Sequence, residues 1–163
     1  MNDIKNDEYY VREALAEARR AEAIDEVPVG AVIVHGGEII AMTHNLRETN
    51  KCATHHAEIL AIEKACRALG GWRLPDTTLY VTMEPCAMCA GAIINARIPR
   101  VVYGTHDLRF GAFGSLLNIS ELPLNHKAEV TGGVLEEECR DLLTAYFKRK
   151  RREQKEYSKE KSE

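Results

Sequence analysis

The chain has 163 residues, of which 45% are hydrophobic and 29% charged, with a formal net charge of −3. This hydrophobic fraction is large enough to fill the core of one domain, and it excludes general disorder. The longest stretch without polar residues, 85–94, is about half of what a membrane-spanning helix needs, which excludes a membrane protein. The polar, acidic first segment and the odd count of five cysteines argue against secretion and a disulfide framework, so we expect a cytoplasmic protein.

The first half of the chain predicts two helices that flank a β-hairpin. Apolar residues recur at helical spacing among Glu and Arg in the first segment, which indicates an amphipathic helix. Two β-rich runs follow, and His35-Gly36-Gly37 between them is typical of a hairpin turn. Gly70-Gly71 ends the second helix in the manner of a C-cap. In chain order, we expect a helix at 7–24, strands at 29–34 and 38–42, and a helix at 56–69.

The second half predicts strands that alternate with helices. Pro85 follows the third strand and is well tolerated in a first helical turn, so we expect the third helix to begin at 84–85. An irregular stretch at 105–123 precedes the last strand. In chain order, we expect a strand at 77–82, a helix at 84–96, strands at 100–104 and 128–130, and a last helix after Gly133. This order predicts a three-layer α/β/α domain with a central mixed five-stranded sheet.

The C-terminal end of the chain differs in charge from the rest. Residues 148–163 hold eight of the 22 Lys and Arg residues but only four of the 25 Asp and Glu residues, so the tail is basic and the body acidic. A basic chain end is commonly a solvated helix end; the alternative is a surface for nucleic-acid phosphates. Charge alone leaves both open. We expect a single domain at 1–152 and a charged tail at 153–163 that continues the last helix.

Two short motifs carry residues suited to metal chemistry. His56 and Glu58 open the second expected helix, and Cys86 and Cys89 open the third, three residues apart and therefore on one helix face. A closed structural zinc site needs a second cysteine pair, which the sequence lacks. A redox-active CxxC is possible but leaves His56 and Glu58 without a role. A catalytic zinc held by His56, Cys86 and Cys89, with water in the fourth position, uses every one of these residues.

Glu58 completes this last interpretation. Residues two apart point about 200° from each other on a helix, so His56 and Glu58 can share a site only at the N-terminal end of their helix. Two thiolates already neutralise Zn²⁺, so bound water is acidified less than in an all-imidazole site and a carboxylate must take its proton. We expect Glu58 to take that proton and to deliver it to a ring nitrogen or a departing amine.

The paired motifs resemble the signature of the zinc-dependent nucleoside and nucleobase deaminases. Longer runs are similar to the bacterial tRNA-specific adenosine deaminases, over about residues 8–152. These runs are 26–34, 44–49, 79–92 and 97–104, with Asn125-His126. The resemblance implies a cytidine-deaminase-like fold, one zinc ion per subunit bound by His56, Cys86 and Cys89, and Glu58 as the proton shuttle. The implied reaction is hydrolytic deamination of the wobble adenosine in the anticodon of an arginine tRNA to inosine, with water attacking C6.

The same resemblance implies contacts to the substrate. Asn45 and Asn125 match residues that hydrogen-bond the flipped-out nucleotide. Pro28 and Val29 match the pocket wall, and Asp107 matches a contact to the neighbouring ribose. The resemblance also implies a homodimer that binds the tRNA anticodon stem-loop. Candidate RNA contacts in the basic tail are Lys148, Arg149, Arg151 and Arg152.

The sequence departs from the family pattern just before the first motif. Residues 51–55 read KCATH, where Pro-Thr-Ala more usually precedes the metal-binding histidine. His55 adjoins His56, and the spacing to Glu58 selects His56 as the ligand. Two alternative functions stay open. One is a deaminase of free nucleobases or nucleosides, such as guanine or cytosine; the other is a zinc or redox module that binds nucleic acid without catalysis.

Overall fold

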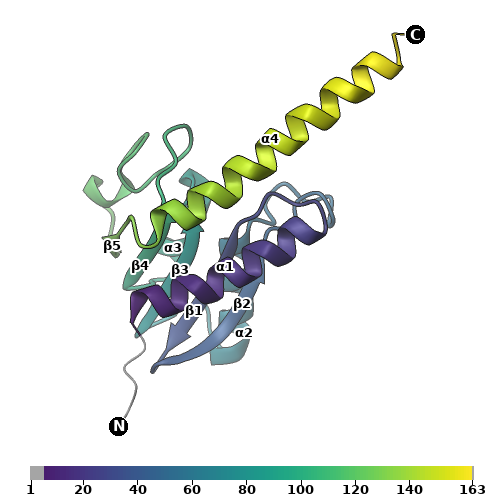
Figure 1. Cartoon of the computed structure of the whole chain (residues 1–163). Coiled ribbons are helices and arrows are strands. Elements are labelled where there is room, and N and C mark those ends of the chain that lie inside the picture. The colour runs from purple at the N-terminus through teal and green to yellow at the C-terminus, as the bar shows by residue number, and fades with distance from the viewer. Residues whose placement is uncertain (1–5, 163) are drawn as a thin grey trace.

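A computed structural model describes residues 6–162 of the chain (Figure 1). The segment 1–5, on which the expectation about secretion largely rests, and residue 163 of the expected tail lie outside the described residues. In chain order the elements are α1 (Asp7–Ala23), β1 (Gly30–His35), β2 (Glu38–His44), α2 (Ala57–Leu69), β3 (Thr77–Met83), α3 (Ala87–Asn95), β4 (Arg100–Thr105), the 3₁₀ helix η1 (Ile119–Glu121), β5 (Glu129–Thr131) and α4 (Glu136–Glu160).

The strands form one sheet in the order β2-β1-β3-β4-β5. β1 is antiparallel to both of its neighbours, β2 and β3, whereas β3, β4 and β5 run parallel to one another. A strand–helix–strand connection through α3 joins β3 to β4, which is how parallel neighbours are usually linked. The expected mixed five-stranded sheet is confirmed.

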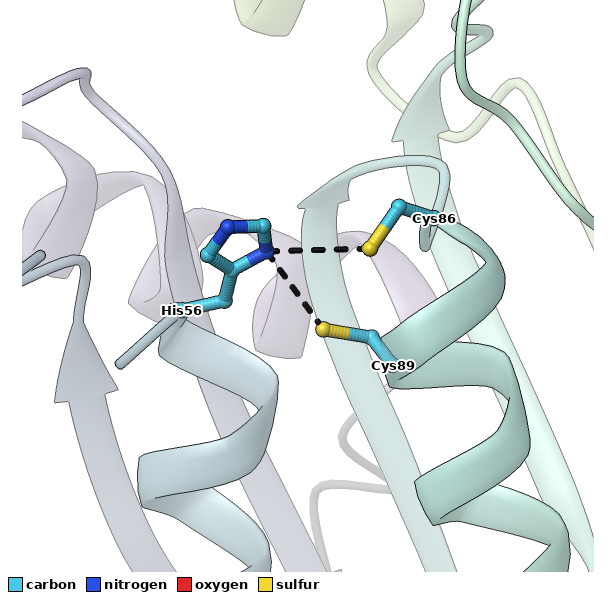
Figure 2. Close-up of side chains that lie close together, drawn as sticks. All are labelled: His56, Cys86 and Cys89. Carbon is cyan, nitrogen blue, oxygen red and sulfur yellow. Dashed lines mark hydrogen bonds between the residues drawn. The ribbon is translucent and has the colours of Figure 1, made fainter. Parts of the chain in front are cut away.

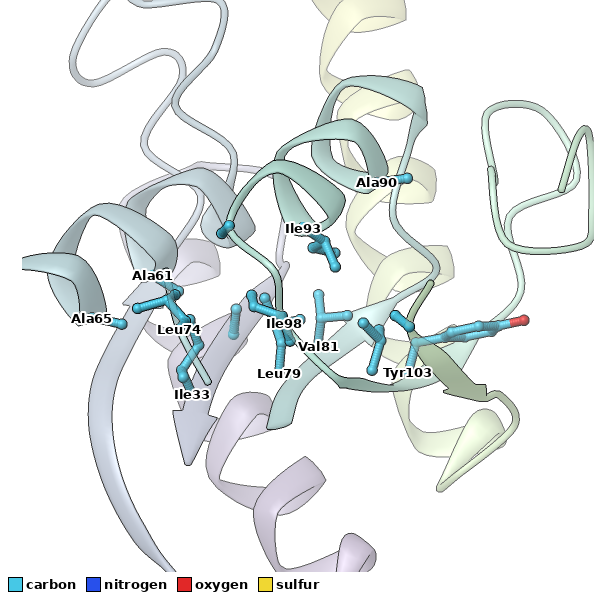
Figure 3. Packing of buried hydrophobic residues seen from close by; sticks show 14 of the residues in the cluster. Ile33, Ala61, Ala65, Leu74, Leu79, Val81, Ala90, Ile93, Ile98 and Tyr103 are labelled. Atoms are coloured by element: carbon cyan, nitrogen blue, oxygen red, sulfur yellow. The ribbon is translucent and has the colours of Figure 1, made fainter. Parts of the chain in front are cut away.

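Helices cover both faces of this sheet, because successive strand residues point to opposite faces. Val32 of β1 packs in one cluster with Leu15 of α1 and Cys139 of α4. The next residue, Ile33, packs in the other cluster with Ala61 of α2 and with residues of α3 (Figure 3). Figure 1 shows α1 and α4 together on one side of the sheet, with α2 and α3 behind it. The three-layer α/β/α architecture is thereby confirmed.

Three helix boundaries differ from the expectations. The expected start of the third helix at Pro85 was wrong, because α3 begins at Ala87. Cys86 has an extended backbone and pairs with Gly111 in an isolated β-bridge, so Pro85 lies before the N-cap rather than in the first turn. α2 likewise begins one residue after His56, which is its N-cap. α4 begins only after Leu135, whose left-handed backbone (φ 52°) turns the chain into the helix.

α4 is the longest helix in the described part of the chain, with 25 residues, and it continues through the expected tail to Glu160. Its composition is strongly charged rather than apolar. Among the described residues, no helix combines the length and the apolar character needed to cross a membrane.

Candidate active site

Several chain segments meet at one edge of the sheet. β2 and β3 both run antiparallel to β1, so β2, β3 and β4 all end at the edge where β1 begins. α2 and α3 start at this same edge, because each follows the end of a strand in this set. In α/β sheets, ligands usually bind outside the carboxyl ends of the strands.

His56, Cys86 and Cys89 come together at this edge (Figure 2). Nδ1 of His56 lies 3.6 Å from Sγ of Cys89 and 3.7 Å from Sγ of Cys86, and the three atoms lie within 4.8 Å of one another. Tetrahedral zinc, with bonds of about 2.0–2.1 Å to nitrogen and about 2.3 Å to sulfur, separates an N and an S ligand by about 3.6 Å. The donor set and its spacing fit a zinc site with three protein ligands and a fourth position open.

The local structure explains why these side chains converge. His56 and Cys86 are the N-caps of α2 and α3, with extended backbones, and neither side chain forms a capping hydrogen bond. Both side chains are therefore free to project beyond the ends of their helices, which lie side by side (Figure 2). Cys89 follows within the first turn of α3 and is fully buried. The positive ends of the two helix dipoles favour thiolates at this point.

Hydrogen bonds within the cluster shift its pKa values. Those from Cys89 and His56 lower the pKa of Cys86 to about 4, so Cys86 carries the thiolate. The hydrogen bond to Cys86, together with burial, raises the pKa of Cys89. The hydrogen bond to Cys86 also raises the pKa of His56. A metal ion that takes all three ligands therefore displaces protons from Cys89 and His56.

Glu58 lies in the first turn of α2 and is only 4% exposed. Burial raises the pKa of its carboxyl group, against the smaller opposing influence of His56. Its carboxylate is within hydrogen-bonding reach of Cys89, so it lies beside the three candidate ligands. This is the position and environment that proton exchange at a metal site requires.

These residues line a pocket with a volume of about 410 Å³. Its lining consists of Val27, Val29, Asn45, Arg47, His56, Ala57, Glu58, Met83, Glu84, Cys86, Asp107, Phe110 and Phe147. Cys89 lies behind this surface. A second hollow of about 590 Å³ lies along β2 between α1 and α2, and none of the three candidate ligands lines it.

The pocket brings together some of the expected substrate contacts but not all. Val29, Asn45 and Asp107 line it beside the candidate ligands. Pro28 is buried between two lining residues, and Asn125 is exposed in the segment between η1 and β5; neither is part of the lining. The roles of all five residues stay predictions.

Asn45 and Asp107 are each held by backbone hydrogen bonds. Oδ1 of Asn45 accepts from the N–H of Arg47 at 3.1 Å, and its Nδ2 donates to the carbonyl of Val27 at 3.3 Å. Oδ1 of Asp107 accepts from the N–H groups of Arg109 and Phe110 at 3.1 and 3.2 Å. Both side chains are therefore fixed in place before any substrate arrives.

Among the pocket residues that the sequence did not single out are Phe110, Phe147 and Glu84. Phe110 and Phe147 are 65% and 42% exposed at its mouth, and Glu84 is 2% exposed in its wall. Phe147 adjoins the basic run and Glu84 adjoins the cysteine motif. Their position next to these motifs was therefore the only signal in the sequence that could have pointed to them. Nothing in the sequence marks Phe110, which occupies the irregular stretch between β4 and β5.

The cations expected to contact RNA lie in two environments. Arg149 pairs with Asp25 at 3.2 Å and with Glu153 at 3.0 Å. Lys148, Arg151 and Arg152 are exposed, and in the described part of the chain they make no ion pair.

The chain is similar to known deaminases along most of its length. The family described as MafB19-like deaminase matches residues 5–150. The tRNA-specific adenosine deaminase of Bacillus subtilis (strain 168) is 52% identical, over 96% of this chain and 98% of that protein. The protein of the same name from Streptococcus pyogenes serotype M1 is 45% identical, over 90% of this chain and 86% of that protein.

Solved structures similar to this chain also include deaminases. A structure from a study of A-to-I editing by tRNA:A34 deaminases at the wobble position of transfer RNA matches with a TM-score of 0.81 and 45% identity, over 83% of this chain and 99% of that chain. A guanine deaminase from Nitrosomonas europaea matches with a TM-score of 0.72 and 26% identity, over 85% of this chain and 83% of that chain. The similarity is therefore greater to this tRNA deaminase than to this guanine deaminase.

Proposed function

Because the chain belongs to the family of the tRNA-specific adenosine deaminases, we propose that it hydrolyses adenosine in tRNA to inosine and ammonia. One observation carries the proposal: His56, Cys86 and Glu58 line a single pocket, with Cys89 directly behind it. A redox-active cysteine pair would need neither the histidine nor the buried carboxylate. The proposal accounts for both of them.

We propose that His56, Cys86 and Cys89 hold one zinc ion in each subunit. When bound, zinc supplies Lewis-acid activation of water. His56 and Cys86 are half-buried and Cys89 is fully buried, so the ligands are largely shielded from solvent. The first-turn position of Glu58 lets its carboxylate reach the reacting groups without displacing a ligand.

Glu58 is the proton carrier in this proposal. Its carboxylate takes a proton from the attacking water and delivers it to N1 of adenine. It then takes the second proton from the hydroxyl group added at C6 and passes it to the amine, which leaves as ammonia. Val29 supplies a wall for the base, and Asn45 and Asp107 offer fixed polar groups to the nucleotide. Pro28 supports that wall from behind, and Asn125 contacts the nucleotide from the segment before β5.

The substrate in this proposal is the wobble adenosine in the anticodon stem-loop of an arginine tRNA. The structural relative studied for wobble editing supports this choice. The pocket supports it too, because exposed Phe110 and Phe147 flank its mouth and can stack on unpaired bases. A free nucleoside would not need these exposed rings. Since tRNA is the substrate, we place the enzyme in the cytoplasm.

We also propose that the protein is a homodimer. Besides Phe110, five large apolar side chains are exposed on the segment 108–124, and we call these five the apolar loop surface. They are Leu108, Leu116, Leu117, Leu122 and Leu124. Apolar side chains gathered in this way commonly mark a protein–protein interface. A second copy of the chain is the partner that the family resemblance implies.

Kinetics on an anticodon stem-loop RNA with a wobble adenosine test the reaction. The wild-type enzyme should form inosine and ammonia from this RNA, and should leave free adenosine and guanine unchanged. Glu58→Ala should retain one zinc per chain, measured by atomic absorption, while kcat falls by about 10²–10⁴-fold because proton transfer is lost. Glu63→Ala is the control, since Glu63 is an exposed carboxylate on the same helix.

Two results would contradict the proposal. A normal rate in zinc-loaded Glu58→Ala would remove Glu58 from proton transfer. Equal turnover of free adenosine and RNA would show that the protein is a nucleoside deaminase instead.

A further inference from the structure

Glu84 is a buried carboxylate that the proposed chemistry does not use. It follows the last residue of β3 and directly precedes Pro85 and the candidate ligand Cys86. In the described part of the chain it forms no ion pair. A buried carboxylate without a cation must be stabilised by hydrogen bonds, or its burial is costly.

A single loop supplies the hydrogen bonds. Oε1 accepts from the N–H of Asp107 at 3.3 Å, and Oε2 accepts from the N–H groups of Phe113 and Ser115 at 3.0 and 3.2 Å. The hydroxyl of Ser115 donates to Oε1 as well. Four donors from residues 107–115 therefore converge on one carboxylate.

This loop, 107–115, also packs closely against the cysteine motif. The N–H of Ala112 donates to the carbonyl of Pro85 at 2.9 Å, and Gly111 pairs with Cys86 in a β-bridge. A Cβ added to Gly111 would overlap the carboxylate of Glu84 and the carbonyl of Asp107, so only glycine fits there. The loop thus packs against both Glu84 and the cysteine motif.

The loop forms one wall of the pocket through Asp107 and Phe110. We propose that Glu84 is a positioning residue: it holds the 107–115 loop in the conformation that binds the RNA substrate, and it does not act on the reacting atoms. This inference rests on the proposed function. It assigns Glu84 to substrate affinity, in contrast to Glu58, which acts in the chemical step.

Glu84→Gln tests this role with the smallest change of shape. An amide keeps one acceptor oxygen, and its NH₂ group cannot accept a hydrogen bond. The oxygen is best placed at the Oε2 position, where it still accepts from two N–H groups. The NH₂ then faces the N–H of Asp107, while the hydroxyl of Ser115 can turn to accept from it. The substitution therefore releases the Asp107 end of the loop in particular.

We expect Glu84→Gln to raise KM for the anticodon stem-loop by about tenfold or more while kcat stays within about threefold. Zinc content should remain one per chain. Direct titration of the same RNA in a Glu58→Ala background should show the same loss of affinity when Glu84→Gln is added. Glu17→Gln is the matched control. Glu17 is 3% exposed and pairs with His44 and Arg20, away from the pocket.

The outcomes separate this inference from the proposed function. A wild-type enzyme without activity on the RNA would overturn the proposed function. Wild-type activity combined with an unchanged KM in Glu84→Gln, or with a loss confined to kcat, would overturn the role of Glu84 alone. If Glu84→Gln does not fold, Gly111→Ala displaces the same loop while the carboxylate is retained. It should raise KM in the same way, and an unchanged KM would overturn the inference.

Discussion

Asp7 joins three elements that lie far apart in the sequence. Nη1 and Nη2 of Arg100 donate to its two carboxylate oxygens at 2.7 and 2.8 Å, and the hydroxyl of Tyr80 donates to Oδ1 at 3.0 Å. Asp7 is the first residue of α1, where a negative charge also interacts favourably with the helix dipole. The hydrogen bonds from Arg100 hold the pKa of Asp7 below its ordinary value. One carboxylate therefore fastens α1 to β3 and β4.

Asp7→Asn should lower the free energy of unfolding at neutral pH by about 1–2 kcal/mol, since it removes a charge-assisted hydrogen-bond pair that is only partly buried. Because the pKa of Asp7 is lowered in the folded state, its stabilising effect is complete above the unfolded-state pKa of about 3.9. The effect is lost as pH falls through the folded-state value. Urea unfolding at pH 7 and at pH 3 measures both.

The stability difference between wild type and Asp7→Asn should thus shrink on acidification. Asp141→Asn is the control, because the Asp141 side chain is 73% exposed and faces only its neighbour Arg140. A stability difference that is the same at both pH values would contradict the assignment of this effect to the Asp7 charge.

At the scale of elements, α4 is fastened to the turn between α1 and β1. Asp25 in this turn accepts from Lys150 at 2.7 Å and from Arg149 at 3.2 Å, and its carbonyl accepts from the hydroxyl of Tyr146 at 3.2 Å. These contacts place Phe147 at the pocket mouth. Arg151 lies one turn further along the same face of the helix than Phe147, and it is exposed.

Arg151→Gln/Arg152→Gln should weaken binding of the anticodon stem-loop, because these exposed cations follow Phe147 along α4 and are proposed to neutralise RNA phosphates. The slope of log K against log salt should become shallower by about 0.7 for each phosphate that is no longer neutralised. Fluorescence titration over a range of salt concentrations measures this slope. Lys159→Gln/Lys161→Gln removes the same number of charges about 12 Å further along the helix and is the control.

An identical slope in Arg151→Gln/Arg152→Gln and in the wild type would show that the tail is only a solvated helix end. A comparable change in the control would show that the whole tail acts as a diffuse charge. In either case the prediction that Arg151 and Arg152 contact the RNA locally would be wrong.

At the scale of the whole molecule, the apolar loop surface is the feature that one chain alone does not explain. Figure 1 shows the segment between β4 and β5, in green, standing apart from the sheet beside α3. The base of this segment is fixed by Glu84, while its leucines face solvent. A fixed loop with exposed apolar side chains is suited to bind a second copy of the chain in the proposed homodimer.

Sedimentation velocity of the wild-type protein should give about twice the chain mass of 18.3 kDa. Leu116→Lys/Leu122→Lys should shift the protein toward the monomer, because charges at the interface core oppose its burial. Ile24→Lys is the control, since Ile24 is 49% exposed at the end of α1, outside the apolar loop surface. A monomeric wild type, or a double variant that stays dimeric, would contradict the proposed interface.

The secondary structure was largely readable from the sequence. The spacing of apolar residues and the glycines at turns and helix ends are local features of the sequence. The helices, the hairpin and the order of elements, which together imply a mixed sheet, could therefore be predicted. The start of α3 was placed too early, because Cys86 is held extended by its pairing with Gly111, a contact 25 residues away. η1 was not predicted, since it lies in an irregular stretch without a clear periodic signal.

The residues of the sequence were enough to predict the chemistry of the candidate site. His56, Cys86 and Cys89 are uncommon residue types at helix starts, and together with Glu58 their two motifs limit the metal and the reaction without any coordinates. The residues that surround them are seen only in the folded chain. Phe110, Phe147 and Glu84 come from separate segments and meet through long-range packing and hydrogen bonds, which leave no local pattern in the sequence. The tertiary structure likewise shows which cations of the tail form ion pairs. Asp25 can pair with Arg149 and Lys150 only when α4 packs beside the turn that holds Asp25.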